Sequence, residues 1–70
     1  MKDSNNISKI IVKGQLVFVL SKDVFVLNSQ LETVYLFIMQ TDPVDLWFPP
    51  TNPSIFYAFC EDNLRIVRFD

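Results

Sequence analysis

The sequence predicts an all-β fold, a small antiparallel meander of about six short strands that forms a barrel or a two-layer sandwich. Three observations lead to this prediction. Short runs of β-branched and aromatic residues, which suit strands, recur along the chain. Two or three polar residues separate several of the runs, which is the spacing of hairpin turns. The central runs are apolar on both faces, so they need cover from a second layer or from curling of the sheet.

The clearest element is a central hairpin built from residues 16–20 and 24–27. The apolar runs LVFVL and VFVL flank the polar residues SKD at 21–23. Pairing Leu20 with Val24 places a large side chain opposite a small one along the ladder, and each such pair contributes roughly 0.2–1 kcal/mol. The pairs that follow are Val19 with Phe25, Phe18 with Val26, and Val17 with Leu27. The expected core comprises Val17, Phe18, Val19, Phe25, Val26, Leu36, Phe56 and Tyr57.

The remaining strands are predicted on either side of this hairpin. Residues 1–6 are polar, so we expect a disordered N-terminal tail before a single small β domain over residues 7–70. A first strand is expected over residues 7–13, followed by a turn at Gly14, which adopts positive φ at no steric cost. Residues 55–60 and 64–69 are expected to form the last hairpin. A loop is expected over residues 41–53, which contain all four prolines.

Residues 29–40 fit two kinds of element. Ser29 and Glu32 have the spacing of a helix capping box. The run from Thr33 to Met39 is rich in β-branched and aromatic residues, which favour a strand. Periodicity does not separate the two in so short a run. We expect a strand here, and the alternative is an α+β fold with one helix near residues 29–40.

The residue types on which most catalytic and metal sites depend are scarce. The chain has no histidine and one cysteine, Cys60, which excludes an internal disulfide, a closed zinc site and a histidine-activated nucleophile. The acidic pairs at 42/45 and 61/62 have no nearby glycine, so they resemble turn residues rather than a calcium loop. We therefore predict that the protein is not an enzyme and has no catalytic residue, cofactor or metal site.

The chain is unusually apolar for its length. Half of its 70 residues are hydrophobic and ten are aromatic. A domain of this size buries only about 60% of the surface that its unfolded chain exposes. Since disulfides and metals are excluded, association is the remaining source of stability. We expect a protein partner or a second copy of the chain, most simply in a homodimer.

The sequence WFPP at 47–50 is the best candidate for the contact. Tryptophan and phenylalanine are effective interface anchors, and flanking prolines reduce the entropy lost on binding. The apolar face of residues 55–59 completes the expected contact, and the alternative is that Trp47 folds back over an open barrel end. The candidate partner-binding residues are Trp47, Phe48, Pro49, Pro50, Ile55, Tyr57 and Phe59.

These features predict a non-catalytic protein-interaction module, acting as a small accessory subunit or as an inhibitor or adaptor of a larger protein. The alternative is a small barrel that binds single-stranded nucleic acid. Its basic residues, at 2, 9 and 13 at one end and at 65 and 68 at the other, merge into one patch if the first and last strands are neighbours. We do not expect this, because the net charge is −2. With no secretory signal and no apolar run of about 20 residues, we expect a cytoplasmic protein without a membrane segment.

One stretch has a family resemblance. Residues 55–70, particularly DNLRIVRFD at 62–70, resemble the outer strands of a WD-type propeller blade, and residues 13–27 are faintly similar. The Gly-His and Trp-Asp pairs of that family are missing. Seventy residues hold fewer than two blades, so the resemblance implies, as a further alternative, a fragment of a β-propeller-like protein.

Overall fold

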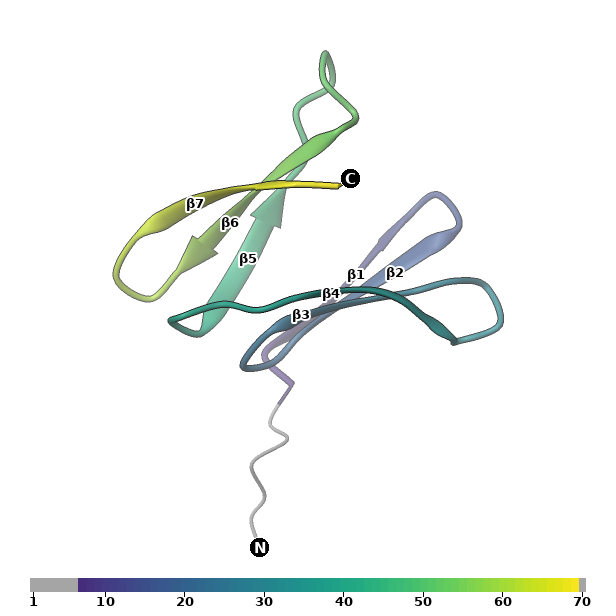
Figure 1. Ribbon diagram of the computed structural model, residues 1–70, viewed down its shortest axis with the longest axis horizontal. Coiled ribbons are helices and arrows are strands. Elements are labelled where there is room, and N and C mark those ends of the chain that lie inside the picture. The colour runs from purple at the N-terminus through teal and green to yellow at the C-terminus, as the bar shows by residue number, and fades with distance from the viewer. Residues whose placement is uncertain (1–6, 70) are drawn as a thin grey trace, which may run out of the picture.

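The computed structural model describes residues 7–69, so the tail expected at residues 1–6 lies outside the described residues. The described range forms seven strands and no helix, which confirms the predicted all-β class. The strands follow one another in two antiparallel sheets, β1–β4 and β5–β7 (Figure 1). Their bounds are β1 Lys9–Lys13, β2 Leu16–Leu20, β3 Val24–Leu27, β4 Thr33–Phe37, β5 Pro43–Trp47, β6 Ile55–Cys60 and β7 Leu64–Arg68.

The central hairpin, β2 and β3, has the predicted register. Leu20 pairs with Val24 and Val17 with Leu27, with no irregularity between them. Gly14 has a φ of 63° in the turn between β1 and β2, as expected from its lack of a side chain. Local turn chemistry and complementary side-chain sizes therefore define this half of the first sheet.

The alternative of a helix near residues 29–40 is wrong. This segment contains β4, which pairs with β3. The polar residues before β4 form a turn: Asn28 Oδ1 accepts hydrogen bonds from the backbone N–H groups of Gln30 and Glu32, at 2.9 and 3.0 Å. The side chain that accepts these hydrogen bonds is thus that of Asn28, and not that of Ser29 as a capping box would require. The β-branched and aromatic residues that follow form a strand.

The prediction of a loop throughout residues 41–53 is also wrong, because this segment contains β5. The strand begins at Pro43, and β5 is an edge strand of its sheet. A proline is tolerated at the first residue of an edge strand, where its missing N–H does not interrupt the ladder. The chain therefore has seven strands within residues 7–69, where about six were expected.

The core lies between the two sheets. Phe18 on β2 and Phe56 on β6 are both buried, and their rings meet edge to face with centroids 5.7 Å apart. Phe69, which follows β7, packs its ring against both of them. Such edge-to-face contacts contribute beyond the area that they bury. The buried hydrophobic cluster comprises Phe18, Leu20, Val24, Val26, Met39, Leu46, Phe56, Ala58 and Cys60, and Pro43 is buried as well.

The core prediction was right for the inner faces and wrong for the outer ones. Phe18, Val26 and Phe56 are buried as expected. The side chain of Leu36 is 48% exposed. Each sheet covers only one face of the other, so strand residues that alternate with the core point away from it. Those expected in the core but only half-buried are Val17, Val19, Phe25 and Tyr57.

Candidate functional site

The structure divides the predicted partner-binding residues between two places. Trp47, Tyr57 and Phe59 lie on the outer face of the β5–β7 sheet, because they occupy paired or alternating positions on β5 and β6. Ile55 lies on the same face, because it is two residues before Tyr57 on β6, and it also lines a pocket. Phe48, Pro49 and Pro50 line that pocket. Residues 47 and 48 therefore belong to different sites although they are adjacent in sequence.

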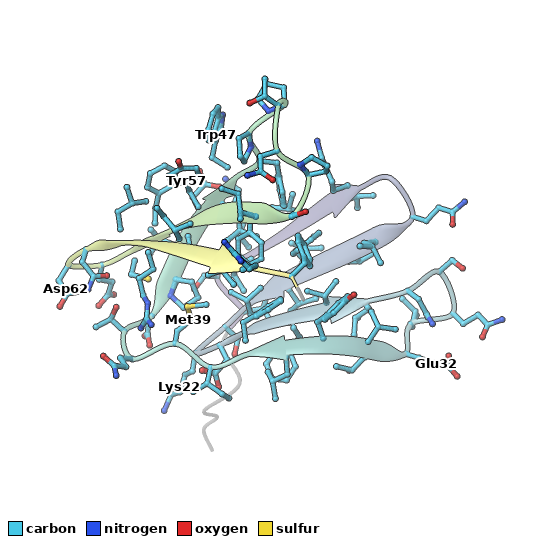
Figure 2. All side chains as sticks on the ribbon, turned by 45° about the horizontal axis from the view of Figure 1, so that its top comes forward. Lys22, Glu32, Met39, Trp47, Tyr57 and Asp62 are labelled. Atoms are coloured by element: carbon cyan, nitrogen blue, oxygen red, sulfur yellow. The ribbon has the colours of Figure 1, made fainter. Side chains whose placement is uncertain are left out.

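Trp47 is held against Tyr57 at the surface. The two residues are direct partners in the β5–β6 ladder, and their ring centroids are 5.5 Å apart. The side chain of Trp47 is 51% exposed. Figure 2 shows both side chains on the side of the second sheet that faces away from the first. Trp47 therefore does not fold back over an open end, and its ring is available at the surface.

Two residues that the sequence analysis did not select extend this surface. In the β6–β7 ladder Ile66 pairs with Tyr57, and Leu64 pairs with Phe59. Ile66 and Leu64 are both exposed. The hairpin register around residues 61–63 places them there, and this register was available from the sequence. We call this surface the aromatic face, and it comprises Trp47, Ile55, Tyr57, Phe59, Leu64 and Ile66.

The outer face of the β1–β4 sheet is a second apolar surface. One row crosses all four strands through Ile10, Val19, Phe25 and Leu36, which are partners in successive ladders. None of the strand positions on this face is charged. From the sequence, four residues of this face were expected in the core: Val17, Val19, Phe25 and Leu36. We call this surface the aliphatic face, and it comprises Ile10, Val12, Val17, Val19, Phe25, Leu27, Val34 and Leu36.

A pocket of about 290 Å³ is lined by residues of both sheets, including Leu16 on β2 and Ile55 on β6. The ribbons of the two sheets diverge toward the β1–β2 turn and the β5–β6 loop (Figure 1). Phe48 forms part of the pocket wall and packs edge to face on Phe18, with ring centroids 5.0 Å apart. The Lys13 ammonium lies 5.2 Å from the centre of the Phe48 ring, which is cation–π geometry. The other lining residues are Pro49, Pro50, Pro53 and Phe69.

An ion pair between described residues joins the two sheets. Lys9 Nζ on β1 lies 3.1 Å from Asp45 Oδ1 on β5. The backbone N–H of Leu46 also donates to Asp45 Oδ1, at 2.8 Å. This hydrogen bond, and after it the one from Lys9, lowers the pKa of the Asp45 carboxyl group. Lys9 is thus engaged with a carboxylate of its own chain.

The groups considered for chemistry have simple surroundings. Cys60 is buried, and its Sγ lies 3.9 Å from the carbonyl oxygen of Ala58, as expected for a small buried hydrophobic residue. Residues 7–69 contain no group of three or more acidic, cysteine or histidine side chains that could hold a metal ion. The same stretch contains no helix of the length and hydropathy needed to cross a bilayer.

Merging of the basic residues into one patch was expected only if the first and last strands are neighbours. β1 pairs with β2 and lies against β5, whereas β7 pairs with β6 at the far edge of the other sheet. The first and last strands are therefore not neighbours in a ladder, so the strand order does not bring Lys9 and Lys13 beside Arg65 and Arg68. Lys2 lies outside the described residues.

Comparison with known proteins identifies the fold alone. No protein-family model matches the sequence, and no curated protein matches it. The chain is similar to a solved structure described as the crystal structure of Pyrococcus horikoshii Ph1500, with a TM-score of 0.61 and 17% sequence identity. The similarity covers 97% of this chain and 46% of that one. The chain thus spans less than half the length of Ph1500.

Proposed function

We propose that this protein is a non-catalytic protein-interaction module that binds its partner through the aromatic face. The observation that supports this most directly is the exposed, pre-positioned pair of Trp47 and Tyr57. Tryptophan and tyrosine are the residues most enriched among interface hot spots. Their rings already restrict each other, so binding costs less side-chain entropy than it would for free side chains.

The neighbours of this pair support a protein partner. Phe59, Leu64 and Ile66 are exposed on the same face and give it an apolar centre. Asp45 and Arg68 occupy positions at its margin, which matches the polar rim of protein interfaces. The module would act as a small accessory subunit, or as an inhibitor or adaptor, and its partner would be another protein or a second copy. We propose a cytoplasmic setting, because a single buried thiol needs no oxidising compartment.

A site-specific crosslink tests this function. A photoreactive benzoyl-phenylalanine at Phe59, itself exposed on the aromatic face, should give a discrete protein adduct in the native cell. Adding Trp47→Glu should abolish the adduct, because a charge then faces the apolar contact. Adding Leu31→Glu should leave it, since Leu31 is 71% exposed in the β3–β4 turn and belongs to neither face. An adduct that survives Trp47→Glu would overturn the proposal.

Two alternatives share part of this support. Exposed aromatic side chains also stack on single-stranded nucleic acid, and such binding weakens steeply and linearly with salt on a log–log plot. A salt titration with labelled oligonucleotides separates this function from protein binding. Two consecutive meander sheets also favour the further alternative of a β-propeller-like fragment, because propeller blades are four-stranded meanders. In that case a longer chain that supplies the missing blades should be more stable than residues 1–70.

A further inference from the structure

We infer that the aliphatic face of one copy packs on the aromatic face of a second copy, so that copies associate head to tail and close into a ring. This inference rests on the proposed function, because it identifies the partner of the aromatic face as the same chain. Its basis is the position, the side-chain composition and the area of the two outer faces.

The two faces lie on opposite sides of the molecule. The inner faces of the sheets pack together around Phe18 and Phe56, so the outer faces point away from each other (Figure 1). Each face covers on the order of 300–600 Å², the size of the largest apolar patch on an ordinary monomer. This chain carries two such surfaces, at the two ends of one stack of sheets.

The faces are complementary in side-chain size. The aromatic face projects the rings of Trp47, Tyr57 and Phe59. The aliphatic face has valine at four of its eight positions and a single aromatic ring, that of Phe25. Aromatic and β-branched residues pack favourably across sheets, and large side chains fill the spaces between small ones. Either face packed on itself would place large on large or small on small.

The areas favour a head-to-tail contact over a twofold dimer. One contact between two such faces removes roughly 600–1,200 Å² from water, at or below the lower limit of specific interfaces. A twofold dimer uses only one kind of face and leaves two copies of the other exposed. A head-to-tail contact uses both kinds, and ring closure gives every copy two contacts and covers both of its faces.

A mixing experiment tests the inference. Val12 on the aliphatic face is 69% exposed, and Ile66 on the aromatic face is 64% exposed, so Val12→Glu and Ile66→Glu each place one charge without disturbing the core. Light scattering after size exclusion should give the wild type a mass above twice that of the 8.2-kDa chain. Each variant alone should be monomeric, because every contact needs one intact face of each kind. The Leu31→Glu control should keep the wild-type mass.

Mixed in equal amounts, the two variants should form a one-to-one dimer through the intact aromatic face of one and the intact aliphatic face of the other. If one variant stays a homodimer, the contact is twofold and the inference is wrong. A monomeric wild type also overturns it. In that case the Phe59 crosslink decides whether the proposed function survives, since an adduct with another protein would keep it. If either variant loses its β circular dichroism signal, Leu36→Glu and Leu64→Glu replace the pair, and a mixture that stays monomeric overturns the inference.

Discussion

The backbone N–H of Met39 donates a hydrogen bond to Asp23 Oδ1 over 2.8 Å. Asp23 lies in the turn between β2 and β3, and Met39 lies in the segment that leads from the first sheet to the second. The Met39 side chain is buried in the core between the two sheets. This hydrogen bond therefore ties the segment that connects the two sheets to the β2–β3 turn.

Replacing Asp23 should loosen this connection. Asp23→Ala leaves the Met39 N–H, which is part-buried, without its acceptor, and we expect the free energy of unfolding to fall by about 1–2 kcal/mol. Asp23→Asn keeps an oxygen acceptor and should retain most of the stability. Urea denaturation at one fixed protein concentration measures both, because association changes the apparent stability. Equal midpoints for Asp23→Ala and the wild type would contradict this role.

The β3–β4 turn carries backbone strain. Leu31 has a φ of 65°, in the left-handed region that leucine rarely adopts. Asparagine tolerates this conformation better, so Leu31→Asn should raise the free energy of unfolding by about 0.5–1 kcal/mol. Gln30→Asn, in the same turn but without positive φ, is the matched control and should change stability little. Thermal denaturation measures the melting temperature of the two variants and of the wild type. Equal changes in melting temperature for the two variants would show that the positive φ of Leu31 is not the cause.

Asp45 should make the stability depend on pH in the acid range. Its pKa is lower in the folded chain than in the unfolded chain, through the Leu46 N–H and then Lys9. Its contribution is therefore complete above the unfolded aspartate pKa of about 3.9 and is lost as the pH falls through the folded value. Asp45→Asn should reduce this acid loss of stability, by a small amount because the ion pair is exposed and screened by salt. Urea unfolding between pH 2 and 6 measures it, and an identical pH profile in Asp45→Asn would contradict it.

The parts of the fold that depend on local chemistry could be predicted from the sequence. The register from Leu20–Val24 to Val17–Leu27 follows from a three-residue polar turn and from matched side-chain sizes. β5 was missed because prolines normally argue against a strand, whereas Pro43 is the first residue of an edge strand, a position that tolerates proline. Only the pairing of β5 with β6 reveals this, and that contact is not local.

The candidate site could be predicted in part. Trp47 and Phe48 were assigned to one contact, although alternation along a strand sends adjacent side chains to opposite faces. Four residues of the aliphatic face, Val17, Val19, Phe25 and Leu36, were expected to be buried. A strand that is apolar on both faces has the same sequence pattern whether its own chain or another chain covers it. The exposure of the aliphatic face at Val12 and Leu36 follows from the stacking of two sheets, which no local pattern specifies.

The central claim is that the aromatic face is buried in a contact between copies of the chain, and sedimentation velocity of Trp47→Asp tests it most directly. At high micromolar concentration the wild type should sediment as an assembly, and Trp47→Asp as a monomer with an unchanged β circular dichroism spectrum. Leu31→Asp, a matched apolar-to-acidic change at an exposed turn residue, should sediment like the wild type. A wild type that sediments as a well-behaved monomer would contradict the claim.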